Sequence, residues 1–227
     1  MSPAPTSSAD ARADLAALCA RGIDWRLDPS RAITLGTATR PAAVLVLFGR
    51  LDSSPAASSS APADIDVLLQ RRAGTLGHHA GQVAFPGGRL EPSDDGPVTA
   101  ALREAAEEVG LDASGVEVLG TLAALPVPVS NHLVTPVPAW WSQPSRVTAV
   151  DHAETVDVFR LAVADLLSPE NRASVAHTRA GATVRTPAFV VDDVLVWGFT
   201  AIVLSRMFDA LGWAVPWDTH RLVVPEV

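Results

Sequence analysis

The chain has 227 residues, of which 48% are hydrophobic and 19% are charged, a composition that predicts a folded globular protein and excludes disorder of the whole chain. Its 17 Lys and Arg residues against 25 Asp and Glu residues give a net charge of −8, which disfavours binding to nucleic acid or to anionic membranes. The single cysteine excludes an internal disulfide and any site built from several cysteines. No signal peptide or membrane-spanning segment is evident, so we expect a cytoplasmic protein.

The first half of the chain predicts two helices and two strands. Residues 11–21 have the pattern of a short amphipathic helix that ends near Gly22, and residues 99–109 form the clearest helix of the chain. Apolar runs at residues 42–49 and 65–69 predict strands. Residues 51–64 are rich in Ser, Ala and Pro, which is typical of a mobile surface insertion within one domain, with a domain linker as the alternative.

The second half predicts mostly strands. They are expected at residues 116–122, 133–141 and 155–159, and as a hairpin formed by 189–191 and 194–196. A short helix is expected at 161–167 and a long one at 201–211. The strands interleave with few helices and show no regular βαβ period, so the pattern indicates an α+β fold.

The helix at 99–109 carries three carboxylates that project together. At about 100° per residue, its apolar stripe is expected to lie opposite an arc that holds all three; the stripe consists of Leu102, Ala105, Ala106 and Val109, and the acids are Glu104, Glu107 and Glu108. Like charges four residues apart destabilise an isolated helix, so a divalent cation such as Mg²⁺, which prefers oxygen ligands, is the natural compensation. The alternative is an acidic face that is simply solvated. Arg103 lies four residues before Glu107 and could orient it.

The residues around this helix resemble a known motif. Gly88, five residues, Asp94, eight residues and then Arg-Glu-Ala-Ala-Glu-Glu-Val-Gly-Leu at 103–111 is similar to the Nudix box. That box is written as Gly, five residues, Glu, seven residues, then Arg-Glu-apolar-x-Glu-Glu-x-Gly-apolar. The first acid here is Asp94, with a spacer one residue longer; choosing Asp95 restores the spacer but places Arg89 at the glycine position.

A second motif resembles the coenzyme A pyrophosphatase branch of the Nudix hydrolases. Residues 68–73 read Leu-Leu-Gln-Arg-Arg-Ala, and residues 81–88 read Gly-Gln-Val-Ala-Phe-Pro-Gly-Gly. The branch signature runs Leu-Leu-Thr-x-Arg-Ser/Ala, three residues, Arg, three residues, Gly, three residues, Phe-Pro-Gly-Gly. Gln70 stands where that signature has Thr, and Gly77 stands where its second Arg is expected.

The resemblance implies an α/β/α sandwich around a mixed β-sheet and metal-dependent hydrolysis of a diphosphate, with Mg²⁺ or Mn²⁺ as cofactor. It assigns Glu104, Glu107 and Glu108 to metal binding, and Glu107 or Glu108 also to the attacking water. Glu154 is a candidate for an extra ligand or base, with a surface loop acid as the alternative. The substrate phosphates are expected to meet Arg71, Arg72, Arg89, Gly87 and Gly88.

The predicted organisation is an N-terminal helix and extension (1–40), a Nudix hydrolase domain (41–211) and a C-terminal tail packed on that domain (212–227). The predicted reaction splits coenzyme A, or a derivative, into (acyl-)phosphopantetheine and adenosine 3′,5′-bisphosphate. The alternatives are a broader hydrolase of dinucleotides, nucleotide sugars or damaged nucleotides, and a Nudix-fold module that binds a ligand without turnover. Family members often dimerise, so a homodimer is one expectation for the oligomeric state.

Overall fold

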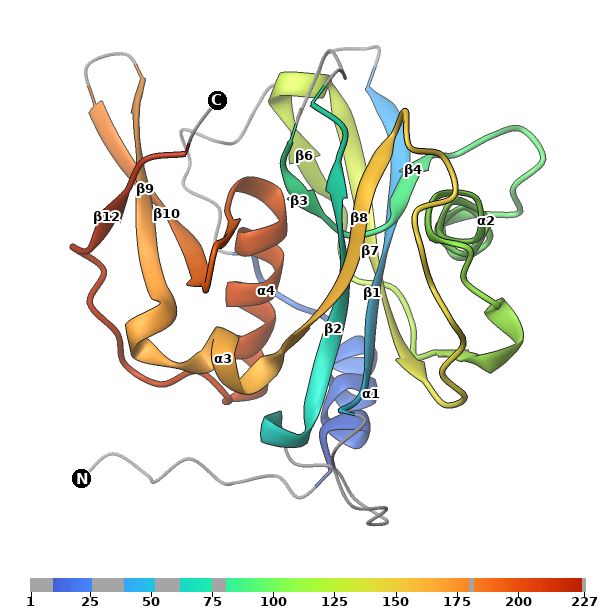
Figure 1. Ribbon diagram of the computed structural model, residues 1–227, viewed down its shortest axis with the longest axis horizontal. Coiled ribbons are helices and arrows are strands. Elements are labelled where there is room, and N and C mark those ends of the chain that lie inside the picture. The colour runs from blue at the N-terminus through green and yellow to red at the C-terminus, as the bar shows by residue number, and fades with distance from the viewer. Residues whose placement is uncertain (1–9, 26–38, 52–61, 75–80, 180–181, 226–227) are drawn as a thin grey trace.

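The structure is a computed structural model that describes residues 10–25, 39–51, 62–74, 81–179 and 182–225 (Figure 1). Most of the predicted insertion at 51–64 lies outside these residues, as do Gly77 and much of the predicted N-terminal extension. The division of the chain into the regions 1–40, 41–211 and 212–227 therefore stays a prediction.

The described chain contains four α-helices: α1 (Ala11–Arg21), α2 (Pro97–Val109), α3 (Val163–Leu167) and α4 (Gly198–Leu211). Helix α1 has the bounds predicted from the sequence, because the Asp10 carboxylate caps its first turn and Gly22, with φ of 77°, ends it. No helix in this part of the chain is long and apolar enough to cross a bilayer.

The larger sheet has eight strands and is mixed, as expected. Strand β1 is parallel to β7 along almost its whole length, and the other pairs in this sheet are antiparallel. The strands are β1 (Arg40–Arg50), β2 (Ile65–Arg72), β3 (Val83–Ala84), β4 (Gly87–Arg89), β5 (Val116–Val118), β6 (Leu125–Val127), β7 (His132–Trp141) and β8 (Thr155–Ala162).

Both faces of the larger sheet are covered, because the side chains of β1 alternate between two apolar clusters. Leu45 and Leu47 pack in the cluster on the α2 side, whereas Val46 and Phe48 pack in the cluster that contains α1 and α4. Figure 1 shows α2 on one side of the sheet and α4 on the other. The fold is therefore the α+β sandwich around a mixed sheet that the sequence predicts.

A second sheet of four strands lies beyond α4, in the order β11-β10-β9-β12 (Figure 1). Its strands are β9 (Arg172–Arg179), β10 (Ala182–Val191), β11 (Val194–Val196) and β12 (Leu222–Val223). The predicted hairpin at 189–196 is confirmed as the β10–β11 pair, but β9, β12 and the first part of β10 were missed. The predicted strand at 116–122 was too long, since β5 ends at Val118.

Candidate active site

Helix α2 presents a different face to the sheet than the sequence predicts. Pro97 begins it, and Gly110, in the left-handed region with φ of 65°, ends it. Its buried residues include Ala105 and Val109 as expected, but Ala106 is exposed and Glu108 is buried. The prediction that the glutamates lie opposite the apolar stripe was therefore wrong for Glu108. Alanines lie on several sides of the helix, so the apolar stripe is not sharply defined by the sequence. On the buried side, Glu108 forms hydrogen bonds with groups that are distant in sequence.

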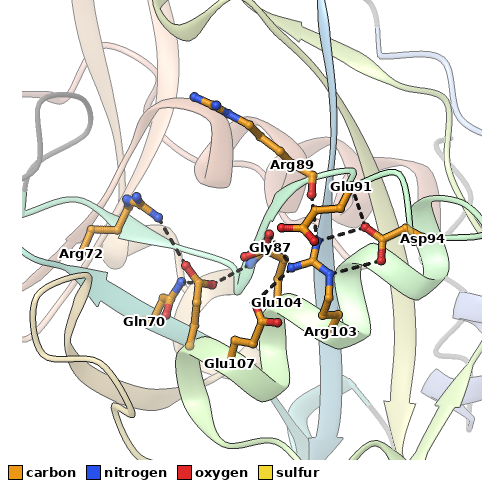
Figure 2. Close-up of polar contacts among 10 residues, drawn as sticks. Gln70, Arg72, Gly87, Arg89, Glu91, Asp94, Arg103, Glu104 and Glu107 are labelled. Carbon is orange, nitrogen blue, oxygen red and sulfur yellow. Dashed lines mark hydrogen bonds and ion pairs between the residues drawn. The ribbon is translucent and has the colours of Figure 1, made fainter.

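The Glu108 carboxylate is held by groups from two other elements (Figure 2). Its Oε2 atom accepts hydrogen bonds from the backbone N–H of Gly87 at 2.8 Å and from Nε2 of Gln70 at 2.7 Å. Its Oε1 atom lies 3.6 Å from Nη1 of Arg72. Burial raises the pKa of Glu108 to about 7, although these three partners favour the carboxylate form. The side chain of Glu108, on helix α2, is thus bonded both to Gly87 and to strand β2. The segment at Gly87 and Gly88 is called the glycine turn.

Arg103 is the centre of a second network, which lies on the other side of the Gly87 turn in Figure 2. Its Nη1 atom donates to Oε1 of Glu104 at 3.1 Å and to Oε2 of Glu107 at 3.0 Å. Its Nη2 atom donates to the carbonyl oxygen of Arg89 at 3.0 Å. The guanidinium therefore ties two of the predicted metal ligands to strand β4, which is the geometry an orienting role requires.

Asp94, and not Asp95, is the acid that Arg103 engages. Nε and Nη2 of Arg103 donate to the two oxygens of Asp94 at 3.2 and 3.0 Å, a two-pronged contact of the kind that fixes a guanidinium plane. This contact, with the N–H of Glu91 as a further donor, lowers the pKa of Asp94 below its usual value. The aspartate in the acid-rich loop thus orients Arg103.

Gly87 and Gly88 are needed because strand β1 and the side chain of Glu104 pass unusually close to them. Gly87 has φ of 153°, and a Cβ atom there would lie 2.3 Å from the carbonyl oxygen of Ala43 on β1. A Cβ atom on Gly88 would lie 2.4 Å from Cδ of Glu104. The sequence suggests close approach of this turn to a ligand, and the structure shows close approach to Glu104 and to the central strand.

Glu104 lies within electrostatic range of two other acids, Glu107 and Glu154. Burial raises the pKa of Glu104, and the like charges of Glu107 and Glu154 raise it further, against the lowering effect of Arg103. Glu154 is exposed, and its carbonyl oxygen accepts a hydrogen bond from the N–H of Ala73 at 2.8 Å. The fold thus brings Glu154 near Glu104 from a loop 50 positions away in the chain.

A cleft of about 380 Å³ opens beside this cluster. Arg72, Gly87, Gly88 and Arg89 line it, whereas Arg71 does not. The rest of its lining is mainly apolar and aromatic and comes from β1, β3, β6, β7 and the start of α4; it includes Val83, Val127, Trp197 and Phe199. His132 also lines the cleft and accepts a hydrogen bond at Nε2 from Nε of Arg89 at 3.3 Å. The predicted substrate residues are therefore brought together except for Arg71.

Sequence reasoning missed the partners that hold Glu108. Gln70 has no exposed surface and directly follows the apolar residues Leu68 and Leu69 in β2, and Thr155 opens β8 with its side chain fully buried. A polar residue that continues an apolar run is the signal that could have identified Gln70, because buried amides need hydrogen-bond partners.

The chemistry of this cluster fits a divalent cation. No three His, Cys, Asp or Glu side chains within the described ranges are already gathered tightly enough to enclose an ion. The available donors are carboxylate oxygens, which Mg²⁺ and Mn²⁺ prefer, and Glu107 keeps 58% of its side chain exposed. Glu104, Glu107 and Glu108 would hold such a cation, with substrate oxygens and water completing its coordination.

Comparisons with known proteins give the family of the chain. A model of the NUDIX domain matches residues 56–178, which is more than half of the chain. The chain belongs to the Nudix family. It is 36% identical over 141 residues to a protein of Photorhabdus laumondii named uncharacterized Nudix hydrolase NudL, covering 62% of this chain and 74% of that protein. The protein of the same name in Yersinia pestis is 37% identical over 142 residues, covering 62% and 70%.

Solved structures with a similar fold include the Nudix hydrolase RenU of M. smegmatis, at 24% identity and a TM-score of 0.42, covering 55% of this chain and 71% of that one. The Nudix domain of Shewanella oneidensis NrtR, solved with ADP ribose, has 22% identity and a TM-score of 0.43, covering 63% and 82%. Family membership supports hydrolysis of a nucleoside-diphosphate-linked substrate with a divalent cation such as Mg²⁺ or Mn²⁺. It does not distinguish among substrates.

Proposed function

We propose that this Nudix protein hydrolyses the pyrophosphate bond of coenzyme A or an acyl derivative, releasing (acyl-)phosphopantetheine and adenosine 3′,5′-bisphosphate. The observation that carries the proposal is the mixed lining of the cleft. Arg72, Arg89 and the backbone of Gly87 and Gly88 offer cationic and N–H groups suited to phosphates. Trp197 and Phe199 contribute apolar surface suited to an uncharged arm. The coenzyme A branch motif at residues 68–88 points to the same substrate.

The polar residues of the cluster divide three tasks in this proposal: holding the cation, orienting its ligands and binding the diphosphate. Glu104, Glu107 and Glu108 hold the cation, and a bound Mg²⁺ or Mn²⁺ neutralises phosphoryl charge and lowers the pKa of the attacking water. Arg103 keeps Glu104 and Glu107 facing the turn. The guanidinium groups of Arg72 and Arg89 bind the diphosphate.

Glu154 and Glu107 are the candidates for proton transfer from the attacking water. Both are exposed, whereas Glu108 has one oxygen already engaged by two donors inside the protein. Glu108 is therefore better suited to holding a cation than to accepting a proton from water. A Glu154→Gln variant that retains full kcat would remove Glu154 from this role.

The proposal is tested by incubating coenzyme A with the purified protein and Mg²⁺, with and without chelator, and separating the products by chromatography. Adenosine 3′,5′-bisphosphate should form only in the absence of chelator. A Glu107→Gln variant should fold and lose most of this turnover. If coenzyme A stays intact while other diphosphates are cleaved, the assigned substrate is wrong and the hydrolase assignment stands.

A broader nucleoside-diphosphate-linked hydrolase is the second candidate, because Gly77 replaces the second Arg of the coenzyme A signature. Comparing coenzyme A with its analogue that lacks the 3′-phosphate separates the two: a dedicated site should prefer coenzyme A, and a broad one should turn over both equally. Tight ligand binding without metal-dependent turnover would instead favour a binding module. The complete set of three glutamates in α2 argues against that last alternative.

A further inference from the structure

Gln70 and Thr155 form a buried relay that ends on Glu108. Both side chains are fully buried, Gln70 on β2 and Thr155 on the neighbouring strand β8. The Oγ1 atom of Thr155 donates to Oε1 of Gln70 at 2.7 Å, and Nε2 of Gln70 donates to Oε2 of Glu108 at 2.7 Å. Figure 2 marks the contact that Gln70 makes with Glu108 by a dashed line. Both hydrogen bonds of the relay have lengths within the usual range.

The relay fixes the direction in which the amide points. A glutamine side chain presents an acceptor at one end and donors at the other, and exchanging the ends would set its oxygen against the carboxylate. The carboxylate can only accept, so the NH₂ group faces Glu108, and the hydroxyl of Thr155 donates to the Gln70 oxygen at the other end. Removing that hydroxyl would take this donor away from the buried amide oxygen, and a buried acceptor without a partner is costly.

The relay also makes the two oxygens of Glu108 unequal. Oε2 accepts from both Gln70 and the N–H of Gly87, whereas the contact of Oε1 is the longer one with Arg72, at 3.6 Å. Two donors on one oxygen restrain rotation of the carboxyl group. Oε1 is therefore the less engaged oxygen, and it lies next to a residue that lines the cleft.

We infer that Gln70 and Thr155 are positioning residues, which hold Glu108 through Oε2 and leave Oε1 available to a divalent cation. The inference rests on the proposed function, because it assumes that Glu108 is a metal ligand. Groups that hydrogen-bond a metal ligand orient it, and removing them commonly weakens metal binding by about 10- to 100-fold. The role belongs to this chain's own pairing, since the branch signature has Thr at position 70.

The test measures Mn²⁺ binding directly, by the electron paramagnetic resonance signal of free Mn²⁺ in a titration without substrate. Gln70→Leu keeps the volume but removes the donor, and we expect Mn²⁺ to bind about 10- to 100-fold more weakly. Thr155→Val should weaken binding in the same direction by a smaller factor, and Thr155→Ser, which keeps the hydroxyl, should restore it. Thr186→Val is the matched control, because it removes a buried hydroxyl whose partner is His177 in the second sheet.

The outcomes separate the inference from the function it rests on. If wild-type protein binds Mn²⁺ and Gln70→Leu binds it equally well, the positioning role is wrong and the metal site stands. If wild-type protein does not bind Mn²⁺, the metal site fails and the relay's role fails with it. Mn²⁺ binding without cleavage of coenzyme A would leave the relay intact and overturn only the substrate. If Gln70→Leu does not fold, the Thr155→Val and Thr155→Ser pair decides.

Discussion

Glu108 and Arg172 are both charged side chains buried by the fold, with 5% and 1% of their surface exposed, yet they are treated very differently. Burial disfavours the charged form of each, raising the pKa of Glu108 to about 7 and lowering that of Arg172 to about 10. The electrostatic cost has the same origin in both places. What differs is the set of groups that offset it.

The partners of Arg172 are mostly ring faces. Its guanidinium carbon lies 4.6 Å from the ring centres of both Phe189 and Trp217, and only Nη2 has a hydrogen bond, to Ser205 at 2.8 Å. Nε and Nη1 have no hydrogen-bond partner among the described residues. Glu108, in contrast, contacts two residues that line the cleft, Gly87 and Arg72. The comparison indicates a charge kept for chemistry at one place and a charge kept for packing at the other.

The largest effect should follow neutralisation of Glu108. Glu108→Gln preserves the shape and an oxygen that can accept from Gly87 and Gln70, so the fold should persist. It removes the negative charge needed at the proposed metal site, and we expect kcat/KM with Mg²⁺ to fall by about 100-fold or more. Steady-state kinetics with a circular dichroism control measures this. Full activity in the Glu108→Gln variant would show that the charge of Glu108 is not needed for catalysis.

The pH dependence of stability should carry the signature of Glu108. The ordinary pKa of a glutamate is 4.5, and that of Glu108 is raised to about 7 in the folded protein. A raised carboxyl pKa contributes stability that is fully present below pH 4.5 and is lost as the pH rises through 7. A shift of this size corresponds to roughly 3 kcal/mol.

Denaturant unfolding of chelator-treated protein between pH 4.5 and pH 8 tests this, with Glu108→Gln as the control. The difference between the two free energies of unfolding should change by that amount in favour of the variant as the pH rises. Other carboxyl groups such as Asp94 titrate in both proteins and cancel. A difference that stays constant with pH would show that folding does not raise the pKa of Glu108.

The sequence predicts the cluster in part, and the reason for the limit is physical. Local periodicity gives helix α2, because the helical pattern depends on residues close together in the chain. It does not give the partners of Glu108, since Gln70 and Thr155 come from strands that pair only in the folded protein. The same holds for Arg172, whose ring partners lie 17 and 45 positions away and whose strand β9 lacks a clear apolar run.

A smaller effect is expected at Gly88, where the turn meets Glu104. In Gly88→Ala, the new Cβ atom would fall 2.4 Å from Cδ of Glu104, so that side chain must move while the backbone stays. We expect kcat/KM to fall by about 10-fold, because misplacing a group near the reacting atoms is costly for rate. Gly74→Ala is the matched control, since its Cβ atom would have nothing within 4 Å. Equal losses in both variants would point to general destabilisation.

The smallest effect should come from Arg172→Met, which removes the charge and keeps most of the volume. Exchanging a poorly satisfied buried charge for an apolar side chain is often neutral, so the free energy of unfolding should change by less than about 1 kcal/mol. Arg172→Ala also removes the packing against Phe189 and Trp217 and should cost about 2–5 kcal/mol. Both variants should retain kcat/KM when folded, because Arg172 does not line the cleft. If the Met variant is as unstable as the Ala variant, the two ring contacts and the Ser205 bond stabilise the cation itself, and Arg172 is held by its charge as firmly as Glu108 is.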